Sequence, residues 1–213
     1  LRYEIALFQV DVDDELVPFE LPDQPGRSFF RNAGKSRREG VELGLAAEPL
    51  RGLLLTLSYT YSDFVYESFS TPAGEFDGKR LPGIPRHYLF AEVAWRHASG
   101  FFAAWEALWA DARFADDANS ARDGAYVVSN LRLGHCFRLG RFDVEPFAGV
   151  NNLFDRAYSD NLRINASANR YFARNVHTRH NRRGRTDTYS MSDRAVQIDQ
   201  YMTGYSDICR KNA

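Results

Sequence analysis

Apolar and polar residues alternate along two adjacent stretches of the chain. The odd positions from 53 to 61 carry Leu, Leu, Leu, Tyr and Tyr, whereas the even positions from 56 to 62 carry only Thr and Ser. Positions 41–48 repeat the alternation, with Val, Leu, Leu and Ala at the odd positions and Glu, Gly or Ala between them. A period of two places the two sets on opposite faces of a β-strand. Only residues 49–52 separate the stretches, so the pattern predicts an antiparallel hairpin closed by a tight turn.

The second strand of this hairpin is unusually long. Its alternation runs from 52 to 66, well beyond the roughly five or six residues of an average strand. A β-strand that crosses a bilayer at a tilt needs about 9–11 residues. A long strand with one apolar and one polar face therefore predicts a membrane-spanning β-barrel.

Further strands are expected on both sides of the hairpin, at residues 1–10, 15–21, 86–97, 100–113, 124–138 and 141–150. Residues 100–113 contain several alanines and two tryptophans four positions apart, so a helix competes there, although the neighbouring strands favour a strand. Tight turns near residues 13, 49, 99 and 140 alternate with polar loops at 21–27, 66–85 and 114–123. Outer-membrane barrels have short turns on one side and long loops on the other. The expected fold is all-β, an antiparallel meander of about eight long strands forming part of a transmembrane β-barrel.

The composition argues against a helical membrane protein but is compatible with both a β-barrel and a soluble β-sandwich. No run approaches the roughly 20 apolar residues of a transmembrane helix, and a mean hydropathy of -0.45 suits a barrel whose inward residues are polar. Aromatic residues make up 14% of the chain, which fits the aromatic belts of a barrel and also an aromatic-rich soluble β-sandwich. A net charge of -1 gives no attractive field for nucleic acid. The two cysteines, Cys136 and Cys209, lie far apart and are expected to be free thiols.

Three short motifs add to the alternation. They are NAGKSRREGVELGL with LLLTLSYTY at 32–45 and 53–61, KRLPGIPRH at 79–87, and VNNLFDRAY at 150–158. Pro82 and Pro85 suit a loop that leads into a strand, because neither has a backbone N–H for a ladder. Asn151 and Asn152 suit a strand end, where Asn side chains bond nearby backbone. In this order the motifs resemble the C-terminal barrel of TonB-dependent outer-membrane receptors, which import ferric siderophores and similar scarce ligands.

The resemblance implies a location in the outer membrane of a Gram-negative bacterium, a ferric siderophore or related iron chelate as ligand, and neither enzymatic activity nor a cofactor. It covers residues 1–172 as a partial barrel in contact with membrane lipid. In the family, a plug domain and the contact with the energising TonB complex lie in an N-terminal part that this sequence does not contain, so the chain is expected to be a fragment that does not transport by itself. Residues 173–213 are polar and lack a period of two, so an irregular or disordered tail is expected there.

The resemblance places candidate ligand contacts in the loops at 66–80, 114–123 and 156–169 and at the mouth of the lumen. The arginines and aromatic residues in these loops that suit an anionic ferric chelate are Arg80, Arg122, Arg156, Arg163, Tyr66, Phe69, Phe76 and Tyr158. Solvation alone also explains polar loops, so no single residue is assigned to a site. Asp116 and Asp117 lack the glycine and terminal glutamate of a calcium loop and are expected to lie in a solvated loop.

Other patterns associated with binding or catalysis are weak or absent from the sequence. An arginine-rich run at 179–185, with His177 and His180 three positions apart, has the residue types of a nucleic-acid or metal site. It lacks interleaved aromatic residues and carboxylate partners, so a solvated tail is expected instead. The sequence contains no nucleophile elbow, phosphate-binding glycine loop or zinc pattern, so catalysis is not expected.

Two other classes of protein stay open. A soluble β-sandwich that binds carbohydrate or protein would bury the apolar face of the hairpin under a second layer of the same chain. A barrel would present that face to lipid, so the surroundings of Val41, Leu53, Leu55 and Leu57 decide between the two. A structural barrel without import activity would share the lipid-facing surface and differ in binding no ligand.

Overall fold

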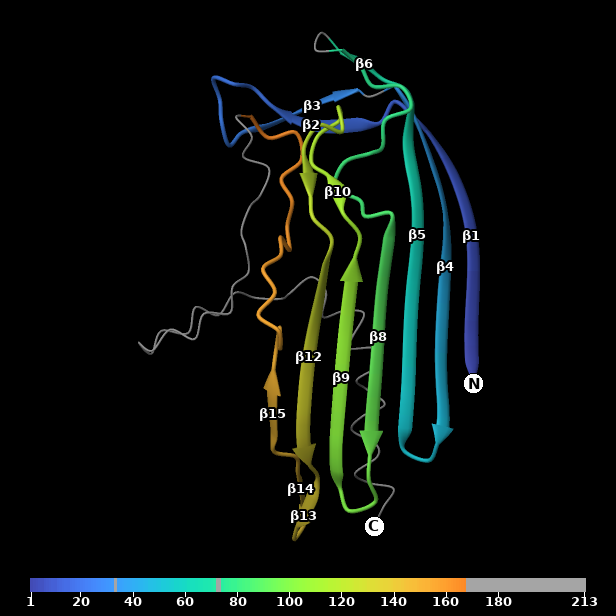
Figure 1. Ribbon diagram of the computed structural model, residues 1–213, viewed down its shortest axis with the longest axis vertical. Coiled ribbons are helices and arrows are strands. Elements are labelled where there is room, and N and C mark those ends of the chain that lie inside the picture. The colour runs from blue at the N-terminus through green and yellow to red at the C-terminus, as the bar shows by residue number, and fades with distance from the viewer. Residues whose placement is uncertain (33, 72–73, 168–213) are drawn as a thin grey trace.

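A seven-stranded antiparallel sheet forms the body of the protein, as the computed structural model shows for residues 1–32, 34–71 and 74–167 (Figure 1). Its strands follow one another in the order β1, β4, β5, β8, β9, β12 and β15. Their bounds are Arg2–Asp13, Lys35–Leu50, Leu53–Ser68, His87–Arg96, Phe101–Ala110, Tyr126–His135 and Phe147–Val150. Among the described strands β1 and β15 are the edges, so the sheet is open. The predicted all-β antiparallel meander is confirmed.

Four two-stranded sheets are attached to the ends of this body. The pairs are β2 (Leu16–Glu20) with β3 (Ser28–Asn32), β6 (Ser70–Thr71) with β7 (Gly74–Glu75), β10 (Arg113–Phe114) with β11 (Arg122–Asp123), and β13 (Phe137–Leu139) with β14 (Phe142–Val144). The first three lie at the end of the sheet that carries the long loops, and the β13–β14 pair lies at the opposite end (Figure 1). In the part of the chain that the structure describes, no helix is long and apolar enough to cross a membrane.

One expected strand does not join the main sheet. Residues 15–21 were expected to follow a tight turn near residue 13 and return along the first strand, but β1 pairs with β4 instead, from Arg2 opposite Ala46 to Asp13 opposite Lys35. The intervening β2 is only five residues long and contains Pro18, which has no N–H for a ladder. It pairs with β3 inside a loop, so the described sheet has seven strands rather than about eight. Its last strand, β15, is short because Pro146 interrupts the return strand.

The tight turns at the other end agree with the prediction. Leu50 pairs with Leu53 across the first turn, and β8 and β9 are joined through residues 97–100. At Gly100, φ is +93° and a Cβ atom would lie 2.1 Å from the carbonyl oxygen of Cys136, so only glycine fits. Residues 101–110 form a strand with partners on both sides, which decides against a helix. Cys136 is disulfide-bonded, so the expected free thiol is wrong there, while Cys209 lies outside the described residues.

Strand register divides the sheet into two chemically different faces. Leu57 lies opposite Leu45 on one side and Ala91 on the other, and Trp105 lies between Val93 and Leu131 in the same way. This apolar face is not covered by a second layer of described residues. Leu57 and Trp105 are 38% and 39% exposed, and none of Val41, Leu53 and Leu55 is buried. A soluble β-sandwich would bury Val41, Leu53, Leu55 and Leu57, so their exposure contradicts that interpretation.

Aromatic residues border the apolar face at both ends. At the loop end, the His87 ring stacks on Trp109 with centroids 6.0 Å apart and shares a 2.8 Å hydrogen bond with the Tyr59 hydroxyl. At the turn end, Trp95 meets Phe101 with ring centroids 6.1 Å apart. His87 and Trp95 are eight positions apart on β8, which corresponds to about 26 Å of strand. The spacing matches the apolar band of roughly 25 Å in outer-membrane barrels.

Candidate ligand-binding site

The long loops pack together at one end of the sheet and form what we call the loop cap, residues 14–32, 69–86, 111–125 and 151–167 apart from the undescribed residues 72–73. Its apolar centre consists of Val17, Phe69, Phe76 and Leu81 from two of these segments, together with Tyr66 from the end of β5. Figure 1 shows these loops crossing over the ends of β5, β8, β9 and β12. The long loops thus form a folded unit with its own apolar centre at one end of the sheet.

A buried carboxylate connects three segments of the loop cap with the end of β5. Asp117 is 2% exposed and accepts hydrogen bonds from the Tyr66 hydroxyl at 2.9 Å and from Nδ2 of Asn165 at 3.0 Å. Nη2 of Arg31 lies 3.1 Å from its second oxygen. Asn165 closes the arrangement, because its Oδ1 accepts the backbone N–H of Asp117 at 3.0 Å and its Nδ2 also donates to the carbonyl of Pro18 at 2.9 Å.

Burial and charge act together on the groups around Asp117. Burial first, and then the nearby Asp117 carboxylate, raise the pKa of Tyr66, which lies beyond the aromatic border of the apolar face. The phenol therefore stays protonated and donates its hydrogen bond. The guanidinium of Arg31 also lies over two aromatic rings, at 4.9 Å from the centroid of Phe19 and 5.3 Å from that of Phe69. These contacts hold the Arg31 guanidinium between Phe19 and Phe69, next to the Asp117 carboxylate.

The neighbouring Asp116 organises its own loop. It is 8% exposed and accepts the backbone N–H groups of Ser120 at 2.7 Å and Ala121 at 3.2 Å. Asn119 adopts a φ of +59° and bonds both backbone groups of Arg80 at 2.8 Å. The expected solvated loop is therefore wrong for both aspartates. The Asp, Asn and Ser residues at 116–120 are typical of such side-chain-to-backbone turns, and this signal could have predicted the local folding.

The aromatic residues proposed to stack on a ligand are engaged within the protein. Tyr66, Phe69 and Phe76 are at most 8% exposed, and their rings pack against one another with centroids 4.7 Å and 5.3 Å apart. Tyr158 packs on Tyr126 with centroids 4.9 Å apart. The first three shape the loop cap from within rather than presenting their faces at its surface.

The four candidate arginines have different surroundings. Arg163 pairs with Glu20, and Arg156 donates to the carbonyl of Ala125 at 3.3 Å. Burial, followed by the neighbouring Arg86, lowers the pKa of Arg80 from its ordinary value. Arg122, at the start of β11, is exposed. Among these contacts, no one partner is shared by the four arginines.

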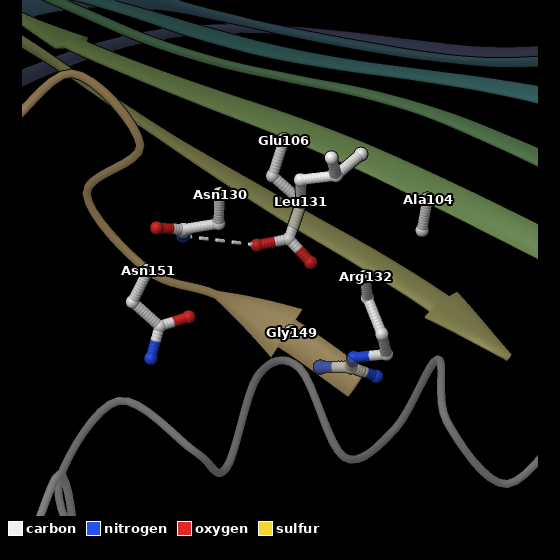
Figure 2. Close-up of a pocket in the computed structure, with 7 residues that line it drawn as sticks. All are labelled: Ala104, Glu106, Asn130, Leu131, Arg132, Gly149 and Asn151. Atoms are coloured by element: carbon white, nitrogen blue, oxygen red, sulfur yellow. Dashed lines mark hydrogen bonds between the residues drawn. The ribbon is translucent and has the colours of Figure 1, made fainter. Parts of the chain in front are cut away.

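The second face of the main sheet is polar where the first is apolar. Glu106 lies opposite Glu92 on one side and Asn130 on the other, and its Oε2 accepts a 3.3 Å hydrogen bond from Asn130. Figure 2 shows the side chains of Glu106 and Asn130 with those of Arg132 and Asn151 around a small pocket next to β15. The face offers carboxylate, amide and guanidinium groups, as expected for the wall of a water-filled lumen. In the described part of the chain, no cluster of His, Cys, Asp or Glu could hold a metal ion.

The strand end after β15 behaves as its sequence predicts. Asn152 has a φ of +51°, and its side-chain amide bonds the carbonyl and N–H of Arg156 at 2.9 Å and 2.8 Å. Its own N–H donates to Oδ1 of Asn130 at 3.0 Å, which connects the chain after β15 to β12. The expected domain boundary at residue 173 and the histidines and arginines at 177–185 lie outside the described residues.

Comparison with known proteins agrees with this geometry. A family model described as "TonB dependent receptor-like, beta-barrel" matches residues 1–153. The ferrichrome outer membrane transporter/phage receptor of Escherichia coli K12 is 28% identical over 143 residues, which cover 65% of this chain and 19% of the relative. The chain thus spans about a fifth of the length of that curated relative.

Solved structures share the fold at lower sequence identity. The ferric preacinetobactin receptor BauA of Acinetobacter baumannii has a TM-score of 0.59 and 17% identity, covering 73% of this chain and 23% of that protein. The ferric yersiniabactin uptake receptor FyuA of Yersinia pestis has a TM-score of 0.59 and 22% identity, covering 78% of this chain and 24% of that protein. At such identities the likeness concerns the arrangement of strands.

Proposed function

The chain belongs to the TonB-dependent receptor-like β-barrel family of the Gram-negative outer membrane, and we propose that it contributes to the uptake of a ferric siderophore or a related iron chelate. The observation that carries the proposal is the separation of three surfaces on one sheet. They are an apolar face bordered by aromatic residues, an opposite polar face, and a folded loop cap at one end of the sheet. In the proposal the apolar face meets lipid and the polar face lines a lumen. The names of the similar proteins, which refer to ferrichrome, ferric preacinetobactin and ferric yersiniabactin, support an iron chelate as ligand.

The proposed path of the ligand runs from the loop cap to the polar face. The exposed Arg122 would attract an anionic chelate, and Asn130 and Arg132 on the polar face would offer it hydrogen-bond donors in the lumen. The buried Asp117 contacts would hold the loops in position before the ligand arrives, which lowers the entropy that binding must overcome. Energy for release into the periplasm would come from the TonB complex, as in the family.

Transport is proposed to require a closed barrel rather than this sheet alone. Among the described strands, β1 and β15 each pair on one side only. An unpaired backbone group in lipid costs several kcal/mol, so these edges are expected to pair with further strands in a bilayer. Further strands between these two edges would close the wall around the polar face. The 213-residue chain by itself is therefore not expected to import a ligand.

Binding of radioactive iron chelates tests this function. Outer membranes from cells that produce the protein, and from matched cells without it, would be incubated with 55Fe-loaded ferrichrome and with 55Fe-loaded yersiniabactin. We expect saturable binding of at least one iron chelate that depends on the protein. Absence of such binding to a protein that still shows heat-modifiable migration, the sign of a folded barrel, would favour a structural barrel without import activity.

A further inference from the structure

One hairpin at the turn end extends past every strand around it. The backbone N–H of Cys136 donates to the carbonyl of Gly100 at 2.8 Å, at the level where the connection between β8 and β9 turns back. Beyond this level β13 and β14 pair with each other, Phe137 opposite Val144 and Leu139 opposite Phe142. Among the described residues they form a separate two-stranded sheet. In Figure 1 this hairpin is the lowest point of the coloured ribbon.

Like the main sheet, the hairpin has one apolar face and one polar face. Phe137, Leu139 and Phe142 are 43%, 65% and 59% exposed. Because side chains alternate along a strand, Phe137 and Leu139 continue the face on which Leu131 and Leu133 lie in β12. The opposite face of the hairpin carries an ion pair between Arg138 and Asp143 at 3.0 Å. Its apolar side is thus a direct extension of the lipid-facing surface.

These exposed apolar side chains need a covering. A two-stranded hairpin by itself is at best marginally stable in water, and its apolar face gains nothing from solvent. The sequence of two phenylalanines and a leucine suits the membrane interface, where aromatic residues are enriched. The guanidinium of Arg141 lies 5.2 Å from the centroid of the Phe142 ring, next to the turn. From there it can reach a lipid phosphate while its stem stays on apolar surface.

We propose that the β13–β14 hairpin is an interfacial anchor whose apolar face lies in the phospholipid leaflet on the turn side of the barrel. Leu139 is four positions beyond His135, which corresponds to about 13 Å of strand. This exceeds the roughly 5–8 Å thickness of one headgroup layer. A hairpin anchored in this way would have to incline along the membrane surface, with Phe137, Leu139 and Phe142 toward the acyl chains and the Arg138–Asp143 pair toward water. This inference goes beyond ligand uptake and does not depend on which chelate is bound.

Depth-dependent fluorescence quenching tests the anchor. An environment-sensitive fluorescent amino acid would replace Leu139 in the full chain, which leaves Cys136 unaltered. The protein would be reconstituted in phosphatidylcholine vesicles with and without bromine at positions 6 and 7 of the acyl chains. A label at Arg138, on the opposite face of the same strand, is the matched control. A label at Val127, which is 50% exposed on the apolar face of β12, reports whether the sheet itself is in lipid.

We expect the brominated lipid to quench the label at Leu139 at least twofold more than the label at Arg138, with quenching at Val127 as well. A label at Phe142, which lies opposite Leu139, should be quenched to the same extent. This second label keeps the test valid if the substitution at Leu139 disrupts the hairpin. Equal quenching at Leu139 and Arg138 would overturn the anchor. A blue-shifted but unquenched label at Leu139 would also overturn it, because protein, such as a second copy of the chain, would then cover the hairpin. Loss of quenching at Val127 too would instead contradict the membrane location of the whole sheet.

Discussion

The hydroxyl of Tyr66 donates a 2.9 Å hydrogen bond to the carboxylate of Asp117, a residue 51 positions further along the chain. The contact joins the end of β5 to the loop between β9 and β12, and both side chains are almost fully buried. It couples the wall of the sheet to the loops that stand over it. The loops at this end of the sheet are therefore held in place by contacts within the protein itself.

Replacing this carboxylate is expected to loosen the loop cap and leave the main sheet folded. Asp117→Ala removes the oxygen atoms that accept from the Tyr66 hydroxyl and from Asn165, and it removes the ion-pair partner of Arg31. The expected loss is about 2–4 kcal/mol in the free energy of loop opening. Hydrogen exchange should accelerate in residues 14–32 and 111–125 and stay slow in β9. Tyr66→Phe removes one donor and should lower the opening free energy by only about 1 kcal/mol. Unchanged loop exchange in Asp117→Ala would show that the contact does not hold the loops.

The tight turn between β8 and β9 is expected to require glycine. In Gly100→Ala the new methyl group would meet the carbonyl oxygen of Cys136 at 2.1 Å in addition to the strain of a positive φ, so the turn must open. Gly140→Ala is the matched control, because Gly140 has a φ of +63° and open space around its Cα. The control should lose about 1–2 kcal/mol of unfolding free energy and Gly100→Ala clearly more. Urea unfolding in detergent measures both, and equal midpoints would contradict the steric argument.

Charge on the two faces of β5 is expected to have unequal effects. Leu57 lies between the aromatic borders on the apolar face, and Ser58 lies on the polar face. Leu57→Arg should lower the unfolding free energy in vesicles by about 2–4 kcal/mol, the effect of a cation near the bilayer midplane. Ser58→Arg should change it by less than about 1 kcal/mol, because the added charge stays in water. A larger effect at position 58 would reverse the assignment of the faces.

The strand end after β15 is expected to depend on one asparagine. Asn152→Ala removes both side-chain bonds to Arg156 and places alanine at a φ of +51°, so local stability should fall by about 2 kcal/mol. Asn152→Gly keeps the backbone relaxed and isolates the loss of the hydrogen bonds. Asn151→Ala, at an exposed neighbouring position, should have little effect. Exchange of the N–H of Leu153, which donates to the carbonyl of Ser129 at 2.7 Å, reports the result.

The alternation of residues along the chain was sufficient to predict most of the main sheet. The strands containing Leu57 and Trp105, the turn at Gly52 and the apolar and polar faces all follow from a period of two, because side-chain direction in a strand is a local property. The proline-containing motif at 79–87 marked the loop that leads into β8, and Asn152 marked the end after β15. The aromatic borders were foreseen only as a class, since their positions depend on which strands are neighbours.

Only the tertiary structure determined how the loop cap packs and that β2 pairs with β3 instead of joining the main sheet. The bond from Asn165 to the carbonyl of Pro18 spans 147 positions, and no local pattern indicates such a partner. The same is true of Asp117, whose carboxylate is buried because three distant donors surround it, and of β2, which pairs within a loop because β4 supplies the longer match for β1. Local sequence determined how each strand presents its side chains. Packing between segments far apart in the chain determined which of those side chains are covered, because burial depends on neighbours that only the folded chain brings together.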